Sequence, residues 1–400
     1  MIKRRILSLD GNYFAQRLLG GLNMGESTNF LETPNEKKAF SAGLNSSLIS
    51  LYSIFEPYVD NIIFCPDNHS WRKTIEPIRP YYLDKSVLIG YKEQRKEKKE
   101  ESPINYDNFY SLYRDFVESI KTKIPVFDIP GLEADDTLML LSNKLNNYPD
   151  VEMITFCTDG DLMQIVKNNS ILFRNIKSGD APNGEFVLNH KKYCDIFEQS
   201  AITQLLGSSE NYSFYKKLFT ITLNNQSSVE RSLHRGINIA TPFKVALVKS
   251  ICGDKKDNLF PIFRWKSTTG TTDFKVTEKH LTKALDCHKL KLTESTCQQI
   301  LTDKDYLSTL IFTLRQVCKQ EHVDLKEIGK HLKHNLHMNV LSVSNVPEQY
   351  LADFDNMWNG YEKELLTGKF DSTILKTLNV AVKDKAINLM ESSIPTITID

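Results

Sequence analysis

"VEMITFCTDGD", residues 151–161, is a short apolar run that ends in two acids. An apolar run of this length, bounded by turn residues, is typical of a buried strand. Similar runs occur three more times, and segments of helix length separate them: "RRILSLD" (4–10), "NIIFCPDN" (61–68) and "IPVFDIP" (124–130). Because strands that alternate with helices form parallel sheets, the sequence predicts an α/β core with a central, mostly parallel sheet flanked by helices.

Acids recur where these predicted strands end. Asp10, Asp67 and Asp159 hold such positions, and open α/β sheets bind ligands outside the carboxyl ends of their strands. "GLEADDTLML" (131–140) adds three acids at the start of a predicted helix: Glu133, Asp135 and Asp136. Each motif alone also suits a simpler role, because Asp–Gly forms turns and acids in a first helical turn favour the helix dipole.

If these acids converge, they require cations. Several carboxylates within a few ångströms cannot all stay ionised without positive charge among them. Oxygen ligands select hard cations such as Mg²⁺ or Mn²⁺, and we expect no His or Cys in the cluster that would favour zinc. Two such ions about 3.5–4 Å apart can activate water and stabilise the leaving oxygen in phosphodiester hydrolysis.

A further segment, "SICGDKKDNLFPI" (250–262), combines a glycine, two acids and two lysines: Gly253, Asp254, Lys255, Lys256 and Asp257. The pattern predicts a helix, a turn and a second helix. Backbone amides and lysines in such an element can hold a duplex phosphate backbone while the acids face the metals. The alternative is a solvated turn.

The run "KEQRKEKKEE" (92–101) contains no apolar residue. As a helix it would place four cations on one face, since positions three and four apart are neighbours: Lys92, Arg95, Lys96 and Lys99. The alternative is a solvated helix with Glu–Lys pairs along its own surface.

Six motifs occur in the order found in the 5′ nuclease (flap endonuclease) superfamily: "LDGN", "CPDNHSWR", "GYKEQRKEKKEES", "LEADD", "TDGDLMQI" and "GDKKDN". Over residues 5–262 the chain resembles this family, most of all the ribonuclease H of T-even phages. The resemblance implies two Mg²⁺ ions, with Mn²⁺ as a substitute, bound by Asp10, Asp67, Glu133, Asp135, Asp159, Asp161 and Asp254. Asp136 and Asp257 also match, but they would lie behind the direct metal ligands or act through water.

The resemblance also implies roles in catalysis and in nucleic-acid binding. Lys92 and Arg95 would face the scissile phosphate, beside the catalytic acids Asp10, Asp67, Asp135 and Asp159. Tyr91 would stack on an unpaired base. The implied nucleic-acid contacts are Arg72, Tyr91, Lys92, Arg95, Lys96, Lys99, Gly253, Lys255 and Lys256. A K⁺ ion at the helix-turn-helix is a further candidate.

The activity implied is that of a 5′–3′ exonuclease and flap endonuclease with ribonuclease H activity. It would cleave duplex DNA, RNA–DNA hybrids and 5′ flaps, as in removing primers from lagging-strand fragments during DNA replication. A tail that recruits a single-strand DNA-binding protein or a sliding clamp would fit the family, although residues 370–400 carry no recognisable docking motif. We expect a monomer in the cytoplasm of a phage-infected host cell.

Length and composition predict more than one structural unit. The chain has 400 residues, and its 50 basic residues balance its 50 acidic ones, so net charge indicates no partner. We expect a 5′ nuclease catalytic domain (1–275) and a helical C-terminal domain (276–400). The first would contain an arch (about 80–105), an insertion (about 195–245) and the helix-turn-helix from about 245. Seven scattered cysteines without a CxxC pair favour a reducing compartment, and no run reaches transmembrane length.

Two other classes of protein compete with this interpretation. A haloacid-dehalogenase-like phosphatase would need a nucleophilic Asp two residues before Asp10, where this chain has Ser8. A non-catalytic nucleic-acid binder would have no use for a cluster of acids that repels phosphate.

Overall fold

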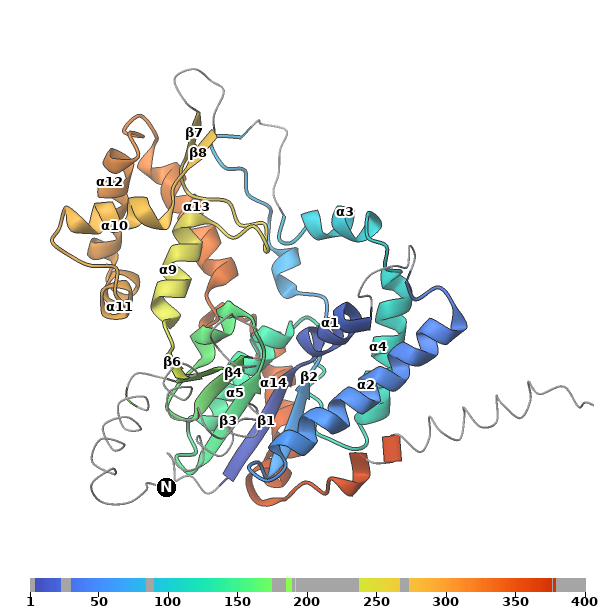
Figure 1. The fold of residues 1–400 in the computed structure, drawn as a ribbon. Coiled ribbons are helices and arrows are strands. Elements are labelled where there is room, and N and C mark those ends of the chain that lie inside the picture. The colour runs from blue at the N-terminus through green and yellow to red at the C-terminus, as the bar shows by residue number, and fades with distance from the viewer. Residues whose placement is uncertain are drawn as a thin grey trace, which may run out of the picture.

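The computed structural model describes residues 4–22, 30–83, 90–174, 185–188, 191, 237–266, 273–375 and 377–378. Its centre is a six-stranded sheet in the order β2-β1-β3-β4-β5-β6 (Figure 1). The strands are β1 (Arg4–Asp10), β2 (Asn61–Cys65), β3 (Val151–Phe156), β4 (Ser170–Arg174), β5 (Glu185–Leu188) and β6 (Ile237–Ile239). Every neighbouring pair is parallel except β4 and β5, so the predicted mostly parallel sheet is confirmed.

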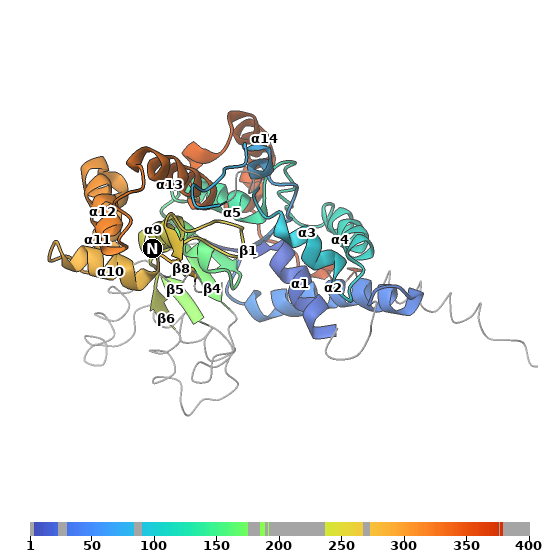
Figure 2. The same cartoon turned by 90° about the horizontal axis from the view of Figure 1, so that it is seen from above.

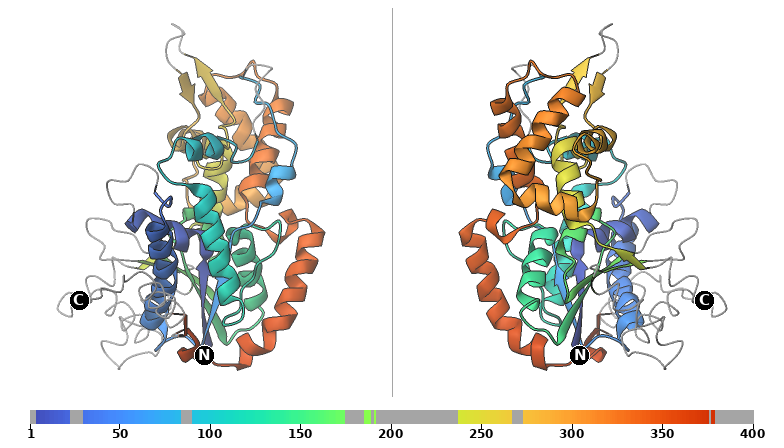
Figure 3. Two further views of the ribbon diagram at one scale, coloured as in Figure 1. Left: turned by 90° about the vertical axis from the view of Figure 1, so that its right-hand side faces the viewer. Right: turned by 90° about the vertical axis from the view of Figure 1, so that its left-hand side faces the viewer.

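Helices cover both faces of the sheet because side chains alternate along each buried strand. Leu7 and Leu9 of β1 face a core formed with three helices: α1 (Gly11–Leu22), α2 (Pro34–Phe55) and α4 (Tyr106–Ile120). Ile6, which precedes Leu7, faces the opposite core, which contains α5 (Ala134–Leu145) and α14 (Glu348–Thr367). Figure 3 shows α14 on one side of the sheet and the blue α1 and α2 on the other.

A helical unit with its own apolar core adjoins the sheet. It consists of α9 (Pro242–Cys252), the hairpin β7 (Arg264–Lys266) and β8 (Asp273–Lys275), α10 (Glu278–Asp286), α11 (Glu294–Thr302), α12 (Lys304–Val317) and α13 (Leu325–Asn339). Helix α9 packs on the short 3-10 helix η2 (Gly160–Ile165), which follows β3. Two other short 3-10 helices are η1 (Trp71–Thr74) and η4 (Val343–Asn345). The unit lies beside the carboxyl end of the sheet (Figure 1).

Several expectations about local structure need correction. The segment 124–130 forms no strand and makes only a single parallel bridge, between Val126 and Phe64. Helix α9 and its turn form as predicted, but the hairpin β7–β8 precedes the next helix, which begins only at Glu278. The expected insertion at 195–245 overlaps β6 and the start of α9, while most of its other residues lie outside the described ones. So do residues 379–400, which include the part of the tail where a docking motif was sought.

The predicted helical C-terminal region is confirmed, yet its last helix packs on the central sheet. Phe354 and Trp358 of α14 are buried in the same core as Ile6 of β1. The Asn61 side-chain amide donates to the carbonyls of Leu365 and Gly368, at the end of α14. Among the described residues, no helix is long and apolar enough to cross a membrane.

Trp358→Ala should lower the free energy of unfolding by about 3–5 kcal/mol, because it empties a buried site between α14 and the sheet. Chemical denaturation monitored by circular dichroism measures the change. Asn359→Ala, at the next and exposed position of the same helix, should stay within about 0.5 kcal/mol of the parent protein. Equal, small effects of the two substitutions would contradict a stabilising role of α14.

Candidate functional site

Three parallel strands bring acids to one edge of the sheet. β1 ends at Asp10, and the register pairs this residue with Cys65, the last residue of β2. Asp67 follows two positions later. On the other side of β1, Leu9 pairs with Phe156, the last residue of β3, and Asp159 follows three positions later. The predicted placement of these acids at strand ends is therefore confirmed, and Figure 1 shows the three strands side by side.

The N-terminus of α5 adds two more acids at the same edge. Glu133 is the N-cap residue and Asp135 lies in the first turn. The backbone N–H of Ala134 donates to Asp67 Oδ1 over 2.7 Å, so a free amide of the first helical turn holds the strand-end carboxylate in place. This contact fixes the helix start against the β2 end.

These acids line a cavity of about 270 Å³. Seven carboxylates border it: Asp10, Asp67, Glu133, Asp135, Asp159, Asp161 and Asp257. The cations at its wall are Lys92, Arg95 and Lys256. Acids that are distant in sequence thus converge, which is the arrangement that the sequence motifs predict.

Burial and mutual repulsion raise the pKa of several of these carboxyl groups. Burial, with the charges of Asp10 and Glu133, raises the pKa of Asp67 to about 7. Burial also raises the pKa of Asp135 well above its usual range, with Asp10 and Asp159 contributing. The pKa of Asp10 is raised by burial too, against the opposing hydrogen bond from the Tyr13 amide. Near neutral pH the cavity therefore needs either protons or cations.

Glu133 behaves differently because cations surround it. Burial would raise its pKa, but Lys92 and Arg72 more than offset that effect and lower it to about 2. Lys92 Nζ donates to Glu133 Oε1 over 2.6 Å. Tyr91 and Ser70 donate hydroxyl hydrogen bonds to Oε2, each over 2.9 Å. Glu133 is thus an ionised carboxylate with its charge already balanced.

A second acidic group joins the sheet to the helical unit. Asp161 of η2 and the turn residues Asp254 and Asp257 have carboxylate oxygens within 4.8 Å of one another. Among the described residues, this is the one set of three potential metal ligands that lies so close. The strand-end acids are spread more widely around the cavity.

The donor atoms of both groups fit hard cations. All the side chains named above offer carboxylate oxygen, the ligand type that Mg²⁺ and Mn²⁺ prefer. The expectation that the cluster contains no cysteine is wrong, because Cys157 lines the cavity and its thiol donates to Asp10 Oδ2. Burial raises the pKa of Cys157 well above its usual range, so its sulfur stays protonated and is no thiolate ligand. An ammonium group already bridges Asp161 and Asp254: Lys249 Nζ lies 2.5 Å from each.

The turn after α9 is held open by its glycine. Gly253 has φ +77, and a Cβ there would lie 2.5 Å from the Leu259 carbonyl oxygen. This conformation lets Asp254 and Leu259 exchange backbone hydrogen bonds across the turn. Gly253 therefore shapes the turn, while Lys255 and Lys256 are exposed on it.

Arg72 and Asp136 lie together below the surface, so Arg72 does not take the position that the resemblance implies. Both are buried, with 2% and 0% of their surface exposed, and they form a two-pronged ion pair of 2.7 Å bonds. Trp71 Nε1 donates to the same carboxylate, and Arg72 Nε donates to the Met338 carbonyl. The pair fastens α5 to η1 and to the end of α13. Arg72 has no open face for nucleic acid. Asp136 does not line the acidic cavity and is connected to Glu133 through Arg72.

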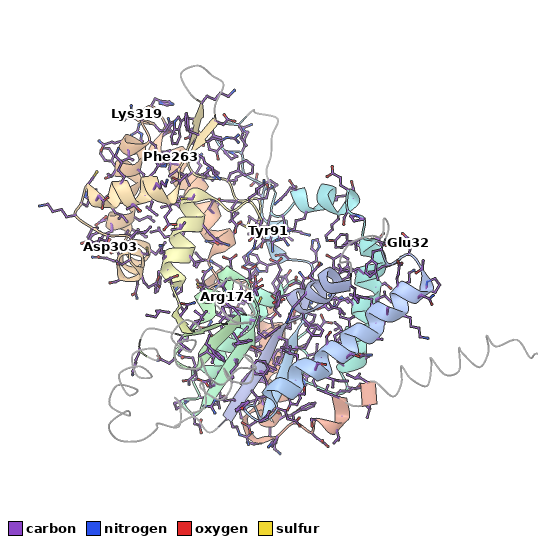
Figure 4. The ribbon with its side chains drawn as sticks, in the orientation of Figure 1. Glu32, Tyr91, Arg174, Phe263, Asp303 and Lys319 are labelled. Atoms are coloured by element: carbon purple, nitrogen blue, oxygen red, sulfur yellow. The ribbon has the colours of Figure 1, made fainter. Side chains whose placement is uncertain are left out.

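The segment 90–101, called the arm below, differs from the expected single cationic helix. Helix α3 begins only at Gln94, and Lys92 lies before it in a left-handed conformation with φ 57. Lys99 turns toward α4, where it donates to the Tyr110 hydroxyl. Tyr91 is only 8% exposed and the Lys92 ammonium lies 4.7 Å from its ring centre, so little of the ring is open to a base. Figure 4 shows Tyr91 between the two units, and α3 lies by α4 in Figure 2.

Hydrogen bonds connect the arm to the turn after α9. Gln94 donates to the carbonyls of Lys255 and Lys256, and Arg95 Nη2 donates to Asp257 Oδ1 over 3.0 Å. Beside this junction lies a larger cavity of about 800 Å³. The basic side chains in its lining are Lys73, Lys92, Arg95, Lys96, Lys99 and Arg114. A basic cavity therefore adjoins the acidic one.

Sequence reasoning missed two cations of this region. Lys249 lies five residues before Asp254, in the last turn of α9. The motif "GDKKDN" begins after this lysine and so does not include it. Arg114 of α4 donates to the Asp67 carbonyl and to Asn68 Oδ1, each over 2.7 Å. No local pattern marks it. Ser8 is fully buried and bonded to Thr155, so the position that a phosphatase nucleophile would need does not face the cavity.

Without divalent cations, the protein should become less stable as pH rises. The folded-state pKa of Asp67 is raised from 3.8 to about 7, so between these values the folded protein binds more protons than the unfolded one. The free energy of unfolding should therefore fall through this window, by up to about 4 kcal/mol, and level out above it. Denaturation in chelating buffers from pH 5 to 8 measures the slope.

The double variant Asp67→Asn, Asp135→Asn should flatten this slope, and Mg²⁺ at pH 8 should stabilise the parent protein far more than the variant. A variant with the parent's slope and the parent's response to Mg²⁺ would refute the role of these two carboxyls.

Comparisons with known proteins show distant structural likeness. No protein-family model and no curated protein matches the chain. A bacteriophage T5 flap endonuclease, solved with DNA and metal ions, is 15% identical with a TM-score of 0.44, over 90% of this chain and 100% of that chain. The T5 5′-exonuclease with bound zinc is 15% identical with a TM-score of 0.46, over 89% and 99%. The catalytic core of Rad2 with a DNA substrate is 14% identical with a TM-score of 0.27, over 95% and 92%.

Proposed function

We propose that the chain is a metal-dependent 5′ nuclease, which hydrolyses phosphodiester bonds of duplex DNA, RNA–DNA hybrids and 5′ flaps. The observation that carries the proposal is the seven-carboxylate cavity with a basic cavity next to it. An anionic polymer would lie in the basic cavity, and its scissile phosphate would enter the acidic one only together with cations. The polarity and the types of substrate come from the ordered motifs of the sequence.

Two cation positions are supported by the arrangement of acids. One would be held by the strand-end group, Asp10, Asp67 and Asp135, with Glu133 beside it. The other would be held by Asp161, Asp254 and Asp257, with Asp159 between the two groups in sequence and at the same cavity. When bound, Mg²⁺ or Mn²⁺ would supply an activated water and stabilise the charge on the leaving oxygen.

Residues of the arm would position the phosphate. The Lys92 ammonium already lies among the acids, 2.6 Å from Glu133 and 3.6 Å from Asp257. A phosphate entering the cavity would compete for this ammonium, which would then face the developing negative charge. Arg95 lies three residues further along and pairs with Asp257, so a phosphate would compete with Asp257 for its guanidinium.

The turn after α9 and the arm would bind the double-stranded part of the substrate. Lys255 and Lys256 are exposed, and neither forms an ion pair with another described residue, so their charges are available to phosphates. Lys96 is exposed at the basic cavity and would add to the same surface. The proposal extends to three further points: primer removal during replication, recruitment of a clamp or single-strand binding protein, and K⁺ at the turn. It also includes the division into a catalytic domain (1–275) and a C-terminal domain (276–400), and a monomeric state.

The activity is tested with a duplex labelled at one 5′ end, with and without a flap, and with the matching RNA–DNA hybrid. Short products should be released from the 5′ end with Mg²⁺ or Mn²⁺ and not with a chelator. Asp159→Asn should reduce turnover by orders of magnitude while binding of the duplex in Ca²⁺ persists. Binding without any metal-dependent cleavage would identify a non-catalytic binder instead.

Lys92→Ala should lower the rate of single-turnover cleavage by about 10²–10³ fold, because it removes a fixed cation from the site of charge development. Its effect on duplex affinity should be much smaller. Lys38→Ala, at an exposed position of α2 that borders neither cavity, is the matched control and should change neither quantity. Equal effects of Lys92→Ala on rate and affinity would make this lysine a binding residue only.

A further inference from the structure

The triad of Asp161, Asp254 and Asp257 already contains a cation. Lys249 Nζ lies 2.5 Å from Asp161 and 2.5 Å from Asp254 Oδ2. Two of the three carboxylates that could hold a metal ion are thus occupied by hydrogen bonds from one ammonium group. Lys249 lies in the last turn of α9.

The position of this ammonium is fixed by the fold. Helix α9 packs on η2, which carries Asp161, and Gly253 then turns the chain back so that Asp254 approaches the same lysine. The Lys249 side chain is 24% exposed, so the ion pairs are only partly screened by water. Burial would lower the pKa of Lys249, but Asp161 and Asp254 more than offset this and raise it, so the group is charged.

A divalent ion and the ammonium compete for the same oxygens. These carboxylate oxygens lie within 4.8 Å of one another, so a small shift would let them surround a single ion at ordinary Mg²⁺–oxygen distances of about 2.0–2.1 Å. The ammonium would then lie within a few ångströms of that ion, where two positive charges repel strongly in a partly buried site. Binding of the ion therefore requires that Lys249 leave at least one of its two carboxylates.

We infer that Lys249 is a resident counter-ion of this triad, which a divalent cation must displace, and that it makes the triad the weaker of the two cation positions. The inference rests on the proposed function for the existence of those positions. Among the described residues, the strand-end carboxylates Asp10, Asp67 and Asp135 form no ion pair, and Lys92 bonds to Glu133 beside them. The two positions should accordingly fill at different concentrations of the cation, and the strand-end position should fill first.

Lys249 also gives the displacement a structural consequence. Asp161 belongs to the segment after β3, whereas Lys249 and Asp254 belong to the helical unit. In the metal-free protein the ammonium joins the two units, and in the metal-bound protein the ion takes over that connection. A lysine released in this way would lie at the edge of the cavity, where the phosphate of a substrate would be its new partner.

Isothermal titration of the whole chain with Mn²⁺ at pH 8 tests the inference. This pH lies above the pKa of Asp161, which burial raises to about 6, so protons compete little with the metal. The parent protein should show a tighter and a weaker binding step. Lys249→Met keeps the unbranched stem and removes the charge, so the weaker step should tighten by about ten- to a hundredfold.

Two control variants separate charge from packing. Lys249→Arg keeps the positive charge and should leave the second step weak. Lys244→Met removes another lysine of α9, one that pairs with Glu278 away from the triad, and should leave both steps unchanged. Unchanged or weakened Mn²⁺ binding at the second step in Lys249→Met would overturn the inference while leaving the proposed metal site intact. If neither the parent protein nor any of these variants binds Mn²⁺, the proposed metal-dependent function itself is refuted.

A measurement on the parent protein covers the case in which Lys249→Met does not fold. Amine-reactive labelling followed by mass spectrometry should modify Lys249 faster when Mn²⁺ saturates both steps, because the displaced ammonium loses its two carboxylate partners. Lys244 is the internal control and should be modified at the same rate with and without Mn²⁺. Equal protection of Lys249 in both conditions would also overturn the inference.

Discussion

Repulsion among carboxylates at one edge of the sheet is the constraint on which this structure depends. The parallel register of β1, β2 and β3 puts their carboxyl ends together, so acids that follow the strands must meet. Burial then prevents water from screening them, which is why the pKa of Asp67 rises to about 7. A fold that gathers acids in this way needs protons or cations to balance them. Here two elements outside the sheet supply cations.

Ion pairs with the acids hold these two elements in position. The arm contributes Lys92 and Arg95, and the helical unit contributes Lys249, each of them bonded to a carboxylate of the cavity or its border. The arm and the turn after α9 also bond to each other, through Gln94 and the carbonyls of Lys255 and Lys256. The ion pairs that neutralise the acids therefore also assemble the surface that a polyanion would meet. Cations or phosphates that compete for these pairs would loosen the same connections.

The sequence predicts the sheet and its acids well because both depend on local patterns. Apolar runs give β1, β2 and β3, and an acid at each strand end needs no knowledge of other elements. The burial of Arg72 and Tyr91 could not be predicted, because a motif shows which residues are near a site but not whether packing buries them. Arg72 is closed off by Asp136 and by the Met338 carbonyl, 266 positions further along the chain. The hairpin β7–β8 and the return of α14 to the sheet likewise depend on contacts that no short stretch encodes.

The return of α14 also bears on how the protein is made. One face of the sheet is covered by α5 and by α14, whose buried residues Phe354, Trp358 and Leu365 come late in synthesis. Until about residue 365 has left the ribosome, the strands that carry the acids lack part of their apolar cover. Domains usually fold as units while the chain is still being made, in order from the N-terminus. The apolar cover of this sheet is instead complete only after α14 has been made, and by then the elements that carry Lys92, Arg95 and Lys249 have been made as well.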